Sequence, residues 1–224
     1  MFVRSSGVVV VVVAAVAYYA RRERVFARSE LAAFDGVERK EIYMAIMGKV
    51  FDVTTGSKFY AKGKSYAFYA GTDGSLSFVT GDFKNNITDN VSSLTPTELY
   101  NLLTWVNGTY YSKYIYKGKL EGYFYDRRGH PTPEMRSIEQ LVAQEREDMK
   151  KREHDEVMYP KCSARRSRTE HRVWCADPLV PRRRSVFGGK ERCACVALDQ
   201  ASAAAADFGP YPDCPPSNSS CNRI

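Results

Sequence analysis

MGKVFDVTTGSKFYAKGKSYAFYAG, residues 47–71, contains the strongest structural signal in the chain. A β-prone run, residues 42–46, passes through Met47-Gly48-Lys49 into a second β-prone run, residues 50–53. Glycine supplies the backbone conformation that a tight turn requires, so these residues predict a β-hairpin. Two strands alone are only marginally stable, and other elements must therefore cover them.

A helix that begins near residue 96 supplies part of this cover. Thr95 and Glu98 have the spacing of a capping box, and Pro96 stands at the first helical position. Apolar residues then recur at steps of three and four, which predicts one face packed on the core. That face consists of Leu99, Leu102, Leu103 and Val106, with Trp105 at its margin.

Shorter elements flank the hairpin and this helix. Residues 25–26 predict a strand, and the next residues predict a short helix with Ser29 as its N-cap and Gly36 at its end. Aromatic runs at residues 110–116 and 122–125 predict extended segments that return to the sheet. Strands and helices thus occur in one domain, and the expected fold class is α+β.

The remaining sequence divides into segments of different character. Residues 1–22 predict a signal peptide or signal anchor, and residues 23–126 the folded domain. Residues 127–160 are charge-dense and thinly apolar, which predicts a solvated helical spacer because no apolar heptads are sustained. Residues 161–224 form a cysteine-containing tail.

The tail holds all six cysteines: Cys162, Cys175, Cys193, Cys195, Cys214 and Cys221. An even number, irregularly spaced in sequence rich in Pro, Arg and Ser, favours a disulfide framework in an oxidising compartment. Zinc binding is the alternative. Cys193 and Cys195 are closer together than the usual two-residue ligand spacing, and no histidine pair completes a site, so disulfides are the preferred interpretation.

Two further signals concern the compartment. Residues 7–20, GVVVVVVAAVAYYA, form an apolar run between basic residues that is typical of a secretory signal and shorter than the roughly 18 to 20 residues of a membrane span. More basic residues follow the run than precede it, which would favour a cytoplasmic domain if the run stays as an anchor. Acceptor sequons favour the lumen: Asn86, Asn90, Asn107 and Asn218. We expect a secreted or lumenal protein, with an endomembrane-anchored one as the alternative.

Charge and motifs exclude several functions. The net charge is +7, but Lys and Arg are scattered among 26 acidic residues and the only dense basic run, residues 181–184, is short. Nucleic-acid binding is therefore not expected, because it needs a basic patch on a recognition fold. The sequence shows no Ser-His-Asp constellation, nucleotide loop or metalloprotease motif, and an enzyme is not expected.

Residues 47–54 resemble the strand-turn-strand of cytochrome b5 domains, where this segment underlies the haem crevice. An ordinary cytochrome b5 would next carry a His-Pro-Gly-Gly loop, but His130, His154 and His171 all follow the last strands expected in the domain. Bis-histidine ligation is thus excluded. Residues 56–82, GSKFYAKGKSYAFYAGTDGSLSFVTGD, instead resemble the tyrosine-bearing haem loop of the membrane-associated progesterone receptor family. The resemblance implies a cytochrome b5-like haem-binding domain.

The resemblance also implies a set of site residues. Tyr66 matches the family's axial ligand of the haem iron, Tyr60 a supporting tyrosine, and Lys113 and Tyr114 the Lys-Tyr pair of the closing segment. The implied cofactor is haem b. A tyrosinate ligand favours the ferric state and lowers the reduction potential, which argues for haem binding, sensing or delivery over electron transfer.

The function implied is that of a non-enzymatic haem-binding protein of the secretory pathway that promotes neuronal differentiation as an extracellular factor. Its receptor is unidentified, exposed haem could join two copies in a homodimer, and membrane contact is expected only through an uncleaved N-terminal segment. Two alternatives remain. One is a membrane-anchored haem donor or partner of cytochrome P450 enzymes, and the other is a haem-free interaction module that works through the cysteine tail.

Overall fold

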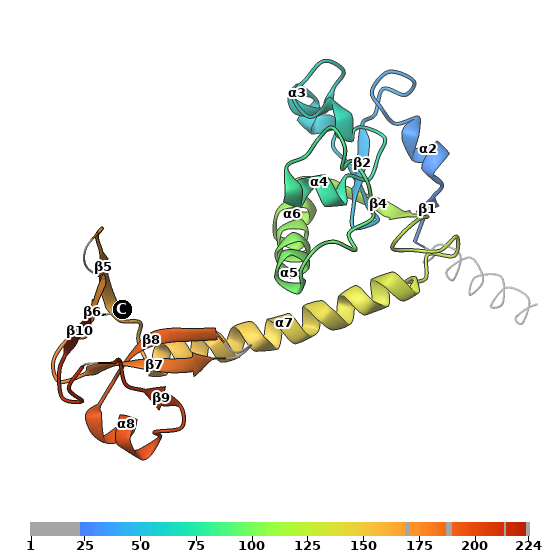
Figure 1. The fold of residues 1–224 in the computed structure, drawn as a ribbon. Coiled ribbons are helices and arrows are strands. Elements are labelled where there is room, and N and C mark those ends of the chain that lie inside the picture. The colour runs from blue at the N-terminus through green and yellow to red at the C-terminus, as the bar shows by residue number, and fades with distance from the viewer. Residues whose placement is uncertain (1–22, 169–170, 187–189, 213, 223–224) are drawn as a thin grey trace, which may run out of the picture. The chain divides into compact units, whose positions relative to one another are not determined.

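The computed structural model describes residues 23–168, 171–186, 190–212 and 214–222. The expected signal segment, residues 1–22, lies outside the described residues. The chain forms two compact units, and the division falls between Ala143 and Gln144 (Figure 1).

The first unit is built on a four-stranded sheet in the order β1-β4-β3-β2. Strands β2 (Tyr43–Ile46) and β3 (Lys49–Asp52) form the predicted antiparallel hairpin. Strand β4 (Ile115–Leu120) pairs antiparallel with β3, and β1 (Val25–Phe26) pairs parallel with β4. The expected hairpin and N-terminal strand are confirmed.

The turn of the hairpin is held from outside. Met47 and Gly48 both adopt positive φ, 54° and 67°. The backbone N–H of Met47 donates to Ser75 Oγ at 2.6 Å, and that of Gly48 donates to the Asp73 carboxylate at 2.9 Å. A side chain at Gly48 would place its Cβ 2.8 Å from the Tyr125 ring, so glycine is required there.

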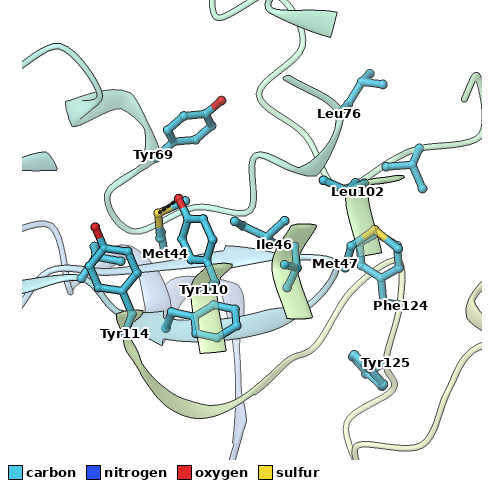
Figure 2. Close-up of a cluster of buried hydrophobic side chains, with 14 of the residues drawn as sticks. Met44, Ile46, Met47, Tyr69, Leu76, Leu102, Tyr110, Tyr114, Phe124 and Tyr125 are labelled. Atoms are coloured by element: carbon cyan, nitrogen blue, oxygen red, sulfur yellow. Dashed lines mark hydrogen bonds between the residues drawn. The ribbon is translucent and has the colours of Figure 1, made fainter. Parts of the chain in front are cut away.

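Both faces of the sheet are covered, which explains why all four residues of β2 are buried. Side chains alternate across a strand, and Tyr43 and Ala45 join a cluster with Phe26, Leu31, Phe34, Val50 and Leu120. Met44 and Ile46 join the larger cluster on the opposite face, part of which is drawn in Figure 2.

Short helices surround the sheet: α2 (Arg28–Ala32), α3 (Ser57–Tyr60), α4 (Ser75–Thr80), α5 (Pro96–Trp105) and α6 (Tyr111–Lys113). Two 3₁₀ turns, Thr54–Gly56 and Ala67–Tyr69, lie before and after α3. The prediction that Ser29 caps α2 was wrong, because the helix begins at Arg28 and its N-cap, Ala27, makes no side-chain hydrogen bond.

Helix α5 begins as predicted. Its capping box is complete, with Glu98 N–H donating to Thr95 Oγ1 at 3.3 Å and Thr95 N–H donating to Glu98 Oε2 at 2.8 Å. Beyond Trp105 the chain continues as one π-helical segment, Val106–Tyr110, and then as α6. The expected extended run at 110–116 was therefore wrong over residues 110–113, because two aromatic rings four residues apart, Tyr110 and Tyr114, bury together on the core through a helical turn.

The outer edge of β2 is covered by the segment that follows the second 3₁₀ turn. Gly71 N–H donates to Tyr43 O at 2.7 Å, Ala45 N–H donates to Thr72 O at 2.8 Å, and Gly74 N–H donates to Ala45 O at 3.3 Å. Residues 71–74 thus satisfy the backbone groups that an edge strand otherwise leaves open.

Helix α7 (Pro133–Met158) begins in the first unit and ends in the second. Met135, Ile138 and Val142, at steps of three and four, pack into the larger core cluster of the first unit. The charge-dense part of the helix that follows is mostly exposed, as predicted for a solvated helix. Within the described part of the chain, none of the helices combines the length and the apolar character needed to cross a bilayer.

The second unit contains two three-stranded sheets, in the orders β10-β6-β5 and β8-β7-β9. Besides the end of α7, its elements are β5 (Ser163–Arg166), β6 (His171–Trp174), β7 (Val180–Val186), β8 (Lys190–Val196), α8 (Leu198–Ala203), β9 (Phe208–Gly209) and β10 (Ser220–Asn222). Its apolar clusters are small, each centred on a handful of buried residues. A unit with so little core depends on covalent cross-links for stability.

Candidate functional site

A pocket of about 410 Å³ opens in the first unit beside α4 and the end of α5. Its volume lies within the usual range of small-molecule sites. The walls are mainly aromatic and apolar, as a flat hydrophobic ligand requires. The lining residues are Tyr60, Tyr66, Tyr69, Ser77, Phe78, Val79, Thr80, Gly81, Phe83, Trp105 and Tyr110.

Tyr66 lies at the rim of this pocket. It directly precedes the second 3₁₀ turn, and its N–H donates to Phe59 O at 2.9 Å. Its ring centroid is 6.3 Å from that of Tyr60 and 6.4 Å from that of Tyr69, yet 42% of the residue remains exposed. Tyr66 is thus anchored by its backbone and by neighbouring rings while its phenol stays accessible.

Tyr60 and Tyr110 form the buried floor of the site. Their hydroxyls are 2.8 Å apart. The Tyr110 hydroxyl also lies 4.0 Å from Met44 Sδ, a contact marked by the dashed line in Figure 2. Burial raises the pKa of Tyr60 to about 12, and burial together with the Tyr60 phenol raises the pKa of Tyr110 further. Burial disfavours the phenolate form of both residues, so each is better suited to hydrogen bonding than to anionic ligation.

Tyr114 lies next to Tyr110, with ring centroids 5.3 Å apart, and Figure 2 shows both rings over the sheet with their hydroxyls on the same side. The Tyr114 hydroxyl is buried but has no hydrogen-bond partner among the residues that the structure describes. Lys113, exposed on α6, has its ammonium 5.2 Å from the Tyr114 ring and 5.8 Å from the Phe59 ring. A buried hydroxyl without a hydrogen-bond partner, on Tyr114, and a positive charge, on Lys113, therefore lie close together in this part of the site.

The far wall depends on glycine. Tyr69 is buried, its ring stacks on Phe78 at 4.3 Å, and its hydroxyl lies 3.0 Å from Ser77 Oγ. Burial also raises the pKa of Tyr69, which disfavours its phenolate form. A Cβ on Gly74 would lie 2.2 Å from the Tyr69 ring, which shows that the wall forms only because residue 74 lacks a side chain.

These residues fit haem. A phenolate is the tyrosine form that coordinates ferric iron, and burial disfavours it, so the accessible Tyr66 suits ligation better than its buried neighbours Tyr60, Tyr69 and Tyr110. Buried donors and a lysine suit the carboxylates that haem carries. The unpartnered hydroxyl of Tyr114 is the feature that a polar ligand atom would satisfy.

The structure brings the four predicted site residues into one neighbourhood, with Tyr66 and Tyr60 in the pocket lining and Lys113 and Tyr114 beside it. Sequence reasoning did not single out Tyr110 as a partner of Tyr60. The signal was present, because Tyr110 precedes Tyr114 by four residues and would share its face in a helix. The interpretation of the run as extended concealed it.

The other predicted residues also have defined places. Asn90, Asn107 and Asn218 are exposed and Asn86 is half-buried, so all four sequons lie in accessible parts of the surface. The six cysteines form three disulfides, which confirms the predicted framework and fixes its pairing as Cys162–Cys193, Cys175–Cys195 and Cys214–Cys221.

Comparison with known proteins identifies the class of this fold and site. Residues 27–121 match the family model of the cytochrome b5-like heme/steroid binding domain. A solved hypothetical protein from Arabidopsis thaliana, described as having a cytochrome b5 like fold, is 32% identical, with a TM-score of 0.41 over 46% of this chain and 94% of that one. The match to the family model identifies the first unit as an α+β, cytochrome b5-like haem/steroid-binding domain.

Relatives extend the similarity over most of the chain. Neuferricin from Xenopus tropicalis is 34% identical over 212 residues, which cover 89% of this chain and 74% of the relative. Membrane-associated progesterone-binding protein 4 from Arabidopsis thaliana is 34% identical over 210 residues, which cover 89% and 84%. The chain belongs to the neuferricin group of the membrane-associated progesterone receptor family.

Proposed function

We propose that this protein binds ferric haem b through Tyr66 and acts as a non-enzymatic haem-binding protein of the secretory pathway. The observation that carries the proposal is the contrast within one aromatic pocket: a single rim tyrosine is accessible, while Tyr60, Tyr69 and Tyr110 are buried, and burial disfavours their phenolate forms. A ferric site with tyrosinate ligation has a low reduction potential, which suits haem storage, sensing or transfer.

The supporting residues have separate roles in this proposal. The Tyr60 and Tyr110 hydroxyls share a hydrogen bond in which either can donate, and when Tyr110 donates, the Tyr60 proton is free for the ligand. Tyr114 donates its unpartnered hydroxyl, and Lys113 supplies positive charge for a haem carboxylate. Phe78 and Trp105, with ring centroids 5.3 Å apart, line the pocket and would supply apolar surface for a bound haem.

The test is a haemin titration of the purified chain followed by its Soret and charge-transfer bands. We expect saturable binding at one haem per chain, and loss of the tyrosinate charge-transfer band in Tyr66→Phe. Tyr111→Phe is the matched control, because Tyr111 is equally exposed, at 43%, but lies outside the pocket lining. Absence of saturable binding would leave the haem-free module as the better interpretation, and an unchanged Tyr66→Phe spectrum would exclude Tyr66 as the ligand.

We propose further that the domain is lumenal or extracellular. Four accessible sequons and the all-disulfide state of the cysteines support this location. Glycosidase treatment of the chain expressed in cells should shift its mobility, and Asn→Gln substitution at Asn86, Asn90, Asn107 and Asn218 should abolish the shift. A membrane-retained chain with no glycan would favour a cytoplasmic partner or haem donor of cytochrome P450 enzymes.

Family membership supports one finer proposal, that the secreted chain promotes neuronal differentiation through a receptor. The test adds purified chain to neural progenitor cells and counts neurites. Haem-loaded wild type should act, and Tyr66→Phe should not if haem is required. Equal activity of wild type and Tyr66→Phe would show that the cellular role does not depend on haem.

The oligomeric state needs a separate test. Analytical ultracentrifugation of the haem-loaded and haem-free forms would show whether haem joins two copies.

A further inference from the structure

Four of the six cysteines converge at one point of the second unit. Cys162 directly precedes β5 and Cys175 directly follows β6, and the hairpin pairs the adjoining residues Ser163 and Trp174, so both cysteines lie at its open end. Cys193 and Cys195 lie on β8 with one residue between them. Alternate residues of a strand face the same side of the sheet, so the sulfurs of Cys193 and Cys195 lie on one face. The spacing is shorter than the two-residue spacing usual in zinc motifs, but the strand itself brings the two sulfurs to the same side.

One distance between sulfurs of different disulfides matches that of a metal site. Cys162 Sγ and Cys175 Sγ lie 3.8 Å apart, and the sulfurs of Cys162, Cys175 and Cys195 all lie within 4.8 Å of one another. Thiolates at about 2.3 Å around a tetrahedral zinc ion are separated by about 3.8 Å. The fourth sulfur, on Cys193, is already bonded to Cys162.

We propose that the second unit has a reduced form in which Cys162, Cys175, Cys193 and Cys195 bind one Zn²⁺. Conversion requires a dithiol reductant. Each protein disulfide takes up two electrons and two protons, while the dithiol is oxidised to its own disulfide. The four thiols then release their protons to solvent as they coordinate the ion. Four sulfur ligands leave no open position, so the zinc is structural and holds the hairpin on β8 as the disulfides do.

The burial of the sulfurs suits a closed metal site. Cys175 and Cys195 are buried, and burial disfavours free thiolates, so a divalent cation would be needed to keep these sulfurs ionised. A buried site with four protein ligands and no open position is typical of structural zinc. The proposal is independent of haem, because all of its residues belong to the second unit.

The experiment uses the full chain in three states. One sample keeps its disulfides, one is reduced with excess dithiol and desalted without oxygen, and each is titrated with Co²⁺ and then Zn²⁺. We expect the reduced chain to take up one Co²⁺, with the visible bands of a tetrahedral site and a sulfur-to-cobalt charge-transfer band that Zn²⁺ abolishes. The third sample, reduced and then reoxidised, should release the metal.

Substitutions then identify the ligands. Cys175→Ser or Cys195→Ser should weaken Co²⁺ binding by about 100-fold, since each removes one of four ligands from a structural site. Cys214→Ser is the matched control, because it removes a cysteine of the same tail that lies outside the cluster, and its affinity should be unchanged. Native mass spectrometry of each chain gives the stoichiometry independently of the optical bands.

Three results would overturn the proposal. The first is no stoichiometric metal uptake by the reduced chain, and the second is equal uptake by the oxidised chain. The third is the same loss of affinity in Cys214→Ser as in Cys175→Ser. Should a serine variant fail to fold, the charge-transfer intensity of wild type still counts the coordinated thiolates, and fewer than four would reject the site.

Discussion

Tyr114→Phe should stabilise the haem-free chain and weaken haem binding at the same time. The ring stays in its place beside Tyr110 and Tyr60, with centroids 5.3 and 6.2 Å away, and only the unpartnered buried hydroxyl is lost. An unsatisfied buried donor costs about 1 to 3 kcal/mol, so the free energy of unfolding of the haem-free chain should rise by up to that amount. Loss of a hydrogen bond to a charged haem group should lower haem affinity by about 10- to 100-fold.

Two measurements on the same samples test both halves of this prediction. Urea unfolding of the first unit gives stability without haem, and haemin titration at the Soret band gives affinity. Tyr60→Phe is the control, because it should change the free energy of unfolding in the opposite direction. The Tyr60 hydroxyl is hydrogen-bonded to that of Tyr110 at 2.8 Å, and its removal should destabilise the haem-free chain by about 1 kcal/mol. A Tyr114→Phe chain that is less stable than wild type, or that binds haem equally well, would refute the reasoning.

Other substitutions test separate parts of the structure. Burial raises the pKa of Asp73 to about 6, above its unfolded value of 3.8. The protonated Asp73 therefore stabilises the fold fully below about pH 4, and this stabilisation is lost as pH rises through 6. The total loss in the free energy of unfolding is about 3 kcal/mol. Asp73→Asn should flatten the pH dependence of unfolding over this window, and an unchanged slope would show that another group is responsible. Gly74→Ala should force the Tyr69 ring into the pocket and weaken haem binding at least about 10-fold, a shift of about 1.4 kcal/mol that titration would detect, with normal affinity as the contrary outcome. Joint replacement of Cys175 and Cys195 by serine should lower the stability of the second unit by about 3 kcal/mol in calorimetry, since it opens a long loop, and should leave haemin titration unchanged; altered titration would show that the tail contributes to the site.

Local signals predicted the elements that local interactions determine. The capping box of α5 depends on residues a few positions apart, and the hairpin follows from the two β-prone runs on either side of Gly48. Both were found where the sequence placed them, although Asp73 and Ser75 also hold the turn from a distance in the sequence. The start of α2 was wrong because Ser29 has the residue type of a cap without the backbone position of one. Residue type alone does not fix that position.

The site was predictable to the extent that a family pattern carries it. Tyr60, Tyr66, Lys113 and Tyr114 came from resemblance, and the structure places them together. The Tyr60–Tyr110 hydrogen bond joins residues 50 positions apart. It follows from how the π-helical segment turns onto the sheet, which no local propensity specifies.

The backbone segment that covers β2 has a consequence for the behaviour of the chain in concentrated solution. Residues 71–74 follow the Tyr66 and Tyr69 segment directly and close the strand edge with three hydrogen bonds. When that segment opens, an apolar strand whose four residues are otherwise all buried presents its free edge to other copies. We therefore expect a ligand that holds the segment closed to suppress self-association as well, and light scattering should show the haem-free protein aggregating before the haem-loaded one.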